Sequence, residues 1–297
     1  MSWNGKVLDN LDQIYWSLDK VGLRSVKGQL SPDGGSYVLP SELLAGGRSL
    51  YCRAQNSAEW KSALVKKEEL LNQVLEIAFA IAPSAFLAEA FFAPLGLSAP
   101  GRIRTIGREA KARHAELAPR QFTQHDGFYL TENAVVMMEM KLKARTSIEQ
   151  YLKYCTLIAL EELLYGRKEH LGLIYIVPAG SVARTRKDLR LDDSDALRSL
   201  WQEPRGHTDK STLLALLDRH AEAIRDVGAR LRITVITWDD FRDVVLRFHN
   251  DARGSGNETL ENLMQGVLAQ LDSTPDCGLV AGRQVKTDNA VAGQPPA

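Results

Sequence analysis

The sequence predicts an α/β fold with a mixed central β-sheet flanked by helices, and three features carry this prediction. Two short apolar runs, at 128–130 and 134–142, are separated by Thr131-Glu132-Asn133, which is the pattern of a β-hairpin. The runs at 171–177 and 231–237 are continuously apolar, as strands buried on both faces of a sheet are. Helical patterns stand between these strands, and that order is typical of parallel strand pairs.

The remaining apolar segments have helical spacing. Pro83 ends the second expected helix, and Gly166 closes the helix that follows the hairpin. The stretch 101–120 is polar and basic, and we expect a solvated loop or helix face there. The tail at 273–297 has few large apolar residues and is expected to be disordered. The expected helices span residues 7–21, 57–82, 85–95, 147–165, 195–201, 211–228, 239–250 and 258–271.

Length and pattern together indicate three regions. The chain has 297 residues, of which 44% are hydrophobic and 25% charged, so it can bury one sizeable core as an ordinary globular protein does. We expect an N-terminal helical region at 1–83 and the α/β core at 84–251. A C-terminal helix and the tail would occupy 252–297.

Charge and cysteine usage restrict the classes of function. The 37 basic and 37 acidic residues cancel, which argues against a broad polyanion-binding coat but leaves room for a local basic groove. Cys52, Cys155 and Cys277 are far apart and form no CxxC pair, so neither a zinc ribbon nor a four-cysteine iron–sulfur site is expected. A reduced, cytoplasmic protein without a signal peptide is the simplest interpretation.

One apolar stretch, at 77–97, is long enough to resemble a membrane span. Pro83, Glu89 and Pro94 interrupt it, and such segments are more often buried helices. We therefore expect no membrane partner.

The register of the hairpin can be predicted by arithmetic. If Glu132 and Asn133 are the two turn residues, directly opposed residues have numbers that sum to 265. Asp126 and Glu139 then lie opposite each other, with their Cβ atoms about 4.5–5.5 Å apart. Lys141 is two residues beyond Glu139 and shares its face of the strand. The other face of this strand carries only apolar side chains, which must pack on a core: Val136, Met138, Met140 and Leu142.

Two opposed carboxylates repel each other, and neither ionises freely without a nearby cation. Lys141 supplies one positive charge. A divalent ion such as Mg²⁺ or Mn²⁺ would supply more, because hard cations are held by one or two carboxylates together with phosphate oxygens and water. A metal and a lysine at one place meet the needs of phosphodiester hydrolysis. The bland alternative is a cross-strand ladder of ion pairs at the surface.

These residues resemble the motif of the PD-(D/E)xK nuclease superfamily. Twelve residues separate Asp126 from Glu139, which begins Glu139-Met140-Lys141, and His125 stands where the motif has proline. Gln150 and Tyr154, on the following helix, are similar to the Q-x-x-x-Y motif of the RecB-like subgroup.

The resemblance implies a restriction-endonuclease-like core and a set of roles for the motif residues. It implies that Asp126 and Glu139 bind Mg²⁺ or Mn²⁺, that Lys141 positions the attacking water, and that Gln150 and Tyr154 help to hold the nucleic acid.

The family also carries an acidic residue on a helix before the hairpin. Glu89 is our choice for this additional metal ligand and catalytic residue, because it is one carboxylate in an otherwise apolar helix. Glu76 is the alternative. The chain departs from the iron–sulfur members of the RecB-like group, because it lacks their four cysteines.

The function expected from the resemblance is hydrolysis of phosphodiester bonds, with DNA as the substrate and restriction, phage defence or repair as the setting. A homodimer or a partner protein of such a system is expected, and the sequence does not distinguish DNA from RNA. The alternative is a catalytically inactive PD-(D/E)xK-like module for nucleic-acid binding or assembly.

A basic cluster after the run 171–177 is predicted either to contact phosphates or to be a solvated loop: Arg184, Arg186, Lys187 and Arg190.

Overall fold

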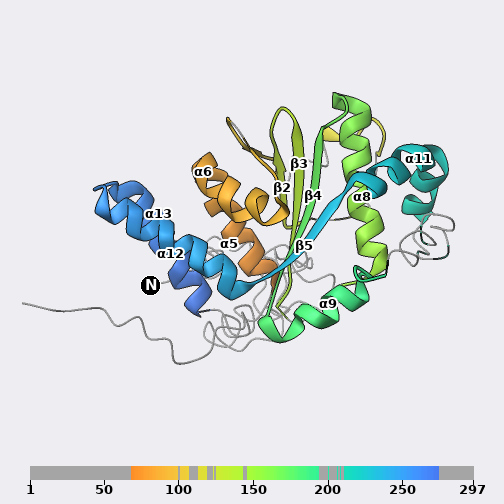
Figure 1. Cartoon of the computed structure of the whole chain (residues 1–297). Coiled ribbons are helices and arrows are strands. Elements are labelled where there is room, and N and C mark those ends of the chain that lie inside the picture. Colours follow the sequence, from red (N-terminus) through yellow and green to blue (C-terminus); the bar gives the residue numbers. More distant parts are fainter. Residues whose placement is uncertain are drawn as a thin grey trace, which may run out of the picture.

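A mixed β-sheet with helices on both faces forms the centre of the computed structural model (Figure 1). The structure describes residues 68–99, 101–106, 113–118, 123, 125–142, 146–193, 200, 206, 208 and 211–273. The helix expected at 7–21, nearly all of the helix expected at 195–201, and the tail expected from 274 onwards lie outside this part.

The described sheet has five strands in the order β1-β2-β3-β4-β5. The first three pair antiparallel, and β3, β4 and β5 pair in parallel, so the predicted mixed α/β sheet is confirmed. The strands are β1 (Arg104–Thr105), β2 (Gly127–Leu130), β3 (Ala134–Met140), β4 (His170–Val177) and β5 (Arg232–Thr237). Only β1 was not expected, since two residues within a basic stretch are too few for a strand pattern.

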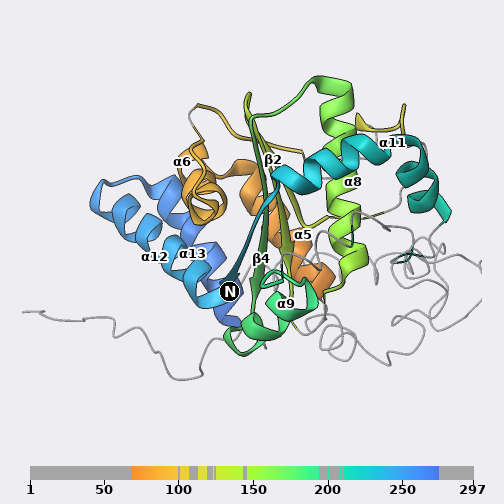
Figure 2. The same ribbon diagram turned by 45° about the vertical axis from the view of Figure 1, so that its right-hand side comes forward.

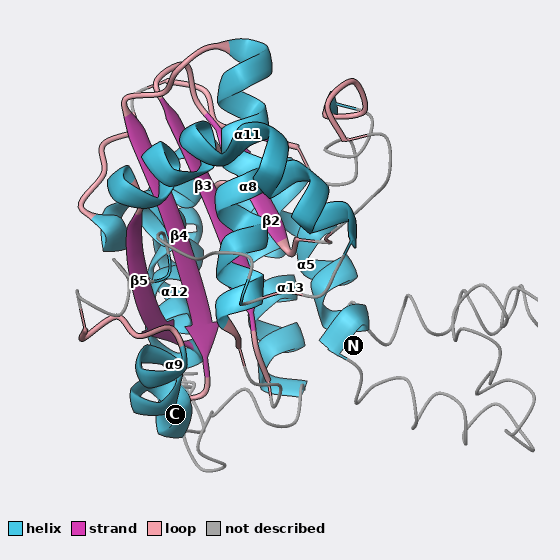
Figure 3. Cartoon of the chain, turned by 90° about the vertical axis from the view of Figure 1, so that its right-hand side faces the viewer, coloured by secondary structure: helices cyan, strands magenta, loops and turns pink. Residues whose placement is uncertain are grey.

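Helices cover both faces of the sheet, which Figure 2 shows nearly edge-on. One layer consists of α5 (Glu68–Ile81), α6 (Ser84–Leu87), the π-helical η3 (Ala88–Phe92), the 3₁₀-helical η4 (Ala93–Leu95), α12 (Trp238–Gly254) and α13 (Glu258–Ser273). The other layer consists of α8 (Ile148–Tyr165) and α11 (Ser211–Arg230). The short η5 (Ala179–Ser181) and α9 (Val182–Asp188) follow the carboxyl end of β4 (Figure 3).

The hairpin has the register that the arithmetic predicts. Gly127 pairs with Met138 and Leu130 with Val135, and the two numbers of each pair sum to 265. The Thr131 hydroxyl accepts a hydrogen bond from the backbone N–H of Ala134 at 2.9 Å, which stabilises the turn.

Strand β3 separates two hydrophobic cores and is buried along its whole length. Val136 and Met138 pack into the core under α5 and α12, as predicted. Val135 and Met137 pack into the core under α8 and α11. The carboxyl end of β3, which includes Glu139, is therefore packed on both faces.

The segment expected as a single helix at 85–95 is divided into α, π and 3₁₀ pieces. Pro94 has no N–H to donate to the carbonyl of Ala90, so the regular α-helical ladder cannot continue through it. Gly96, with φ of 64°, ends the segment in a left-handed conformation that glycine adopts without strain. In the described part of the chain, no helix has the length and apolarity needed to cross a membrane.

The expected boundaries of the other helices differ little from the observed ones. Ser147 caps α8 by accepting a hydrogen bond from the N–H of Gln150 at 3.2 Å, and Gly166 ends that helix. Helix α5 falls within the predicted N-terminal region 1–83, yet its side chains belong to the core under the sheet. The helical region and the core are thus continuous at this point.

Candidate active site

The motif residues lie at one end of the strands of the sheet. Asp126 directly precedes β2, Glu139 is the penultimate residue of β3, and Lys141 directly follows β3. Because β2 runs antiparallel to β3, the start of one strand lies beside the end of the other. The carboxyl ends of β4 and β5 lie at this same end, since both run parallel to β3.

The carboxylate of Asp126 links helix α5 to the end of β3. Its Oδ1 accepts a hydrogen bond from the side-chain amide of Asn72 at 2.6 Å. Its Oδ2 accepts one from the backbone N–H of Met140 at 2.7 Å. Charge-assisted bonds of this kind are strong, so they fix the carboxylate beside the strand end.

The carboxylate of Glu139 is held from the other helical layer, by α8, whereas the arithmetic of the hairpin predicted that Asp126 and Glu139 share one face. Glu139 is 3% exposed, and its described contacts include an amide, a hydroxyl and an ammonium group. The amide of Gln150 donates to Oε1, the hydroxyl of Tyr154 donates to Oε2, and the ammonium of Lys141 lies 2.5 Å from Oε1. A buried carboxylate is costly unless it is paired and hydrogen-bonded, and here it is both.

The backbone of Lys141 is fixed by two elements. Its N–H donates to the carbonyl of Ile176 in β4 at 2.9 Å. Its carbonyl accepts from the indole N–H of Trp238, the buried first residue of α12, at 2.9 Å. The backbone from which the Lys141 side chain extends is therefore held in place.

Both residues of the Q-x-x-x-Y pair form hydrogen bonds with a carboxylate. Gln150 and Tyr154 are expected to help hold nucleic acid, and in the structure both donate hydrogen bonds to Glu139. The pair lies in the first two turns of α8, whose positive N-terminal end also favours a negative charge nearby. Their direct effect is to orient Glu139.

The fourth predicted site residue, Glu89, forms an ion pair with Arg247 of α12, and the two side chains are 40% and 60% exposed. None of the described hydrogen bonds or ion pairs joins Glu89 to Asp126. Glu76 lies on α5 one turn beyond Asn72, and its charge acts with that of Asp126 on the Tyr129 hydroxyl. Glu76, the alternative, thus lies on the helix that contacts Asp126, whereas Glu89 is paired with α12.

Sequence reasoning missed Asn72. Its spacing of four residues from Glu76 places both on one face of α5, and this was the available signal. Nothing in the sequence indicates that this face meets Asp126, which is 54 residues further along the chain.

Two buried tyrosines lie next to the two carboxylates. Burial, and then the negative charges of Asp126 and Glu76, raise the pKa of Tyr129 well above 10. Burial and the charge of Glu139 likewise raise the pKa of Tyr175. Both phenols therefore keep their protons at any physiological pH.

The side chains at this end of the strands include the oxygen donors that a hard divalent cation takes. Asp126, Glu139 and Glu76 offer carboxylate oxygens, and Asn72 Oδ1 is a buried acceptor without a hydrogen-bond partner among the described residues. In that part of the chain, no group of three or more His, Cys, Asp or Glu residues is already arranged around a metal position. Mg²⁺ does not require one, because it is commonly bound by one or two carboxylates and completed by water and phosphate.

The basic cluster was expected to contact phosphates or to be a solvated loop, but its first three residues lie on the helix α9 and the fourth just beyond it. Helix α9 follows the carboxyl end of β4, at the same end of the strands as Lys141. All four of its side chains are exposed. Arg184 donates to the Ser181 hydroxyl at 3.1 Å, and Arg186 pairs with Asp192 at 2.5 Å. Phosphate contact and a solvated surface both remain compatible with this placement of Arg184, Arg186, Lys187 and Arg190.

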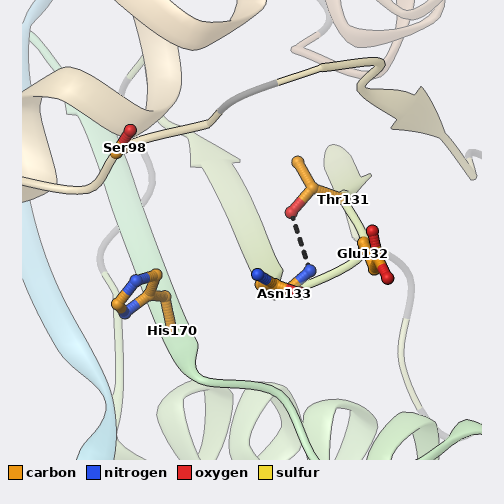
Figure 4. Close-up of a pocket in the computed structure, with 5 residues that line it drawn as sticks. All are labelled: Ser98, Thr131, Glu132, Asn133 and His170. Carbon is orange, nitrogen blue, oxygen red and sulfur yellow. Dashed lines mark hydrogen bonds between the residues drawn. The ribbon is translucent and has the colours of Figure 1, made fainter.

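A separate pocket lies at the opposite end of the hairpin (Figure 4). Its volume is about 150 Å³, and polar side chains surround it. The hydrogen bond from the Asn133 N–H to the Thr131 hydroxyl shapes its wall (Figure 4). The lining residues are Ser98, Thr131, Glu132, Asn133 and His170. This pocket and the motif residues occupy opposite ends of β3.

In comparisons with known proteins, no family model, no curated protein and no solved structure matches the chain. The likeness to PD-(D/E)xK nucleases is therefore confined to the motif residues themselves. Their positions are the end of one doubly buried strand and the first two turns of the helix that follows it.

Proposed function

We propose that the chain is a metal-dependent nuclease of the PD-(D/E)xK type that hydrolyses phosphodiester bonds in DNA. One observation carries the proposal: Asp126 accepts from the backbone N–H of Met140 and Lys141 pairs with Glu139, so all three motif residues lie at the end of a strand that is buried on both faces. Separate elements hold each of them, with α5 on Asp126, α8 on Glu139, and β4 with α12 on Lys141.

The oxygen atoms of Asp126 and Glu139 would hold Mg²⁺ or Mn²⁺, with Glu76 as a further carboxylate. The ion, when bound, supplies polarisation of the phosphoryl oxygen and makes water more acidic. Lys141 would orient the attacking water and neutralise the negative charge that develops on the phosphate.

The hydrogen bonds around the carboxylates support catalysis by positioning. Gln150 and Tyr154 restrict the rotation of the Glu139 side chain, and the amide of Met140 does the same for Asp126. Groups that are oriented before the substrate arrives need no rearrangement as charge develops. A cytoplasmic role in restriction, phage defence or repair, as a homodimer or with a partner protein, accompanies this proposal.

The test is cleavage of supercoiled plasmid, linear duplex, single-stranded DNA and RNA in the presence of Mg²⁺, Mn²⁺ or EDTA. We expect DNA cleavage with either metal and none in EDTA. Lys141→Ala and Asp126→Asn should each lower the rate by about 100-fold or more, as loss of a charge-stabilising group does. Lys168→Ala and Asp272→Asn are the matched controls, because these side chains make surface contacts elsewhere and should not matter.

Two results would count against the proposal. Absence of cleavage by folded wild-type protein with both metals would favour an inactive binding module, which should also bind Mg²⁺ poorly in a titration. Cleavage that survives in both Lys141→Ala and Asp126→Asn would place the active site elsewhere in the chain.

A further inference from the structure

Tyr129 is a buried tyrosine that the proposed chemistry has not yet used. It lies in the middle of β2 with no exposed surface, and its ring stacks on Phe91 with centroids 4.6 Å apart and planes at 14°. Its hydroxyl is buried and has no hydrogen-bond partner among the described residues. Buried hydroxyls nearly always have a partner, so this oxygen calls for an explanation.

Gly127 determines where that hydroxyl lies. A Cβ atom at Gly127 would come within 2.8 Å of the Tyr129 hydroxyl oxygen and 2.9 Å of Cε2, so the ring lies across the glycine. The side chain is thereby directed back along β2, towards the residue before Gly127, which is Asp126.

Two carboxylates act on this hydroxyl. After burial, Asp126 and then Glu76 of α5 raise the pKa of Tyr129, so the oxygen keeps its proton beside two negative charges. The neighbouring Asn72 also presents a buried oxygen without a described partner. A neutral O–H donor and a neutral carbonyl therefore accompany the carboxylates on the α5 side of Asp126.

We propose that Tyr129 is a positioning residue for the cation: it acts through Asp126 and Glu76, and its hydroxyl donates to the oxygen atoms that surround the ion. This inference rests on the proposed function. It adds a residue that lies outside the D…ExK and Q-x-x-x-Y motifs and on the opposite face of the sheet from Gln150 and Tyr154. Partners that orient metal-binding carboxylates typically change metal affinity by about 10- to 100-fold.

The test is calorimetric titration of the full chain with Mg²⁺ and with Mn²⁺. Tyr129→Phe removes only the oxygen and keeps the ring on Phe91, so the circular dichroism spectrum should not change. We expect the dissociation constant to rise by about 10- to 100-fold. Tyr151→Phe is the matched control, because that buried tyrosine directs its hydroxyl to the carbonyl of Gly228 at 3.5 Å.

A second readout is spectroscopic. Adding the metal to the wild type should perturb the near-ultraviolet absorption of the tyrosines at the site, and this difference signal should decrease in Tyr129→Phe and remain complete in Tyr151→Phe. The part that remains in Tyr129→Phe comes from Tyr154, whose hydroxyl donates to Glu139. A merely structural tyrosine would give no such signal.

Equal affinities of the wild type and Tyr129→Phe, in a protein that binds metal and cleaves DNA, would overturn this inference and leave the proposed function intact. An equal loss in Tyr151→Phe would also overturn it. A wild type that neither binds metal nor cleaves would instead remove the proposed function itself.

Discussion

Glu139 is the residue on which the site depends most. It interrupts an otherwise apolar strand and is almost fully buried, so water cannot solvate its charge. The compensation comes from side chains of the neighbouring helix and from Lys141. Truncating any one of these donors leaves a buried carboxylate short of a partner, which typically costs about 1–3 kcal/mol.

Tyr154→Phe distinguishes positioning of Glu139 from direct binding of the substrate. The hydroxyl that it removes donates to Glu139, so we expect kcat to fall about 10- to 100-fold with little change in KM. Steady-state cleavage rates measured over a range of DNA concentrations give both constants. A rise in KM at constant kcat would instead support the role in nucleic-acid binding that the motif implies.

At the scale of the element, strands with long apolar runs and helices with clear ends were predictable. Ser147 and Gly166 mark both ends of α8 because capping is local chemistry. The two-residue β1 was not predictable, since pairing with β2 rather than local preference determines it. Pro94 was a local signal that the helix at 85–95 could not stay regular, but it did not indicate a π-helical turn.

The segment at 113–118 is attached to α8 through one buried carboxylate. Arg113 donates two hydrogen bonds to Glu161, at 2.7 and 2.6 Å, and His114 Nε2 lies 3.0 Å from the same carboxylate. Burial alone would raise the pKa of Glu161, but the hydrogen bonds and charges of Arg113 and His114 lower it below its usual 4.5.

This cluster predicts a specific loss of stability in acid. Because the folded-state pKa of Glu161 lies below the unfolded value, the unfolded chain takes up the proton first as the pH falls. The stabilisation is complete above pH 4.5 and is lost as the pH falls through the folded-state pKa. In urea unfolding over a pH series, Glu161→Gln should have a lower free energy of unfolding than the wild type, and this free energy should change less with pH.

Glu149→Gln is the control, since its carboxylate pairs with Lys153 on the first turn of the same helix and is partly exposed. If Glu161→Gln followed the acid limb of the wild type in parallel, another group would be responsible for the pH dependence.

At the scale of the whole molecule, two cores share one strand. Met137 contacts the core under α8, and Met138 contacts the core under α5; both are fully buried. Met137→Ala and Met138→Ala should each lower the free energy of unfolding by about 2–5 kcal/mol.

Because both cores pack on β3, each variant should unfold in a single transition, with circular dichroism and tryptophan fluorescence changing together. Leu163→Ala, at a position that is 48% exposed, should change stability by no more than about 0.5 kcal/mol. Separate transitions for the two sides of the sheet would show that the cores are independent.

The site was predictable where it depends on the hairpin. The register predicted that Asp126 lies beside the end of β3 that carries Glu139 and Lys141, because residue numbers within a hairpin determine which residues are opposite each other. It did not predict that α5 would bind Asp126 and α8 would bind Glu139. The contributions of Asn72, Trp238 and Tyr129 depend on how distant helices pack or on how one ring lies over a glycine. No periodicity in the sequence reports such contacts.

Strand β5 has a consequence for how the molecule behaves in concentrated solution. It is the last strand of the sheet, and exposed edge strands tend to recruit strands from other molecules. The guanidinium of Arg232, at the start of β5, binds the carbonyls of Leu95 and Gly96 at 3.4 and 3.0 Å, so a charged residue and a crossing loop stand at this edge. A charged side chain and a crossing loop at an edge strand oppose pairing with a strand of another molecule, and this pairing is one route to aggregation.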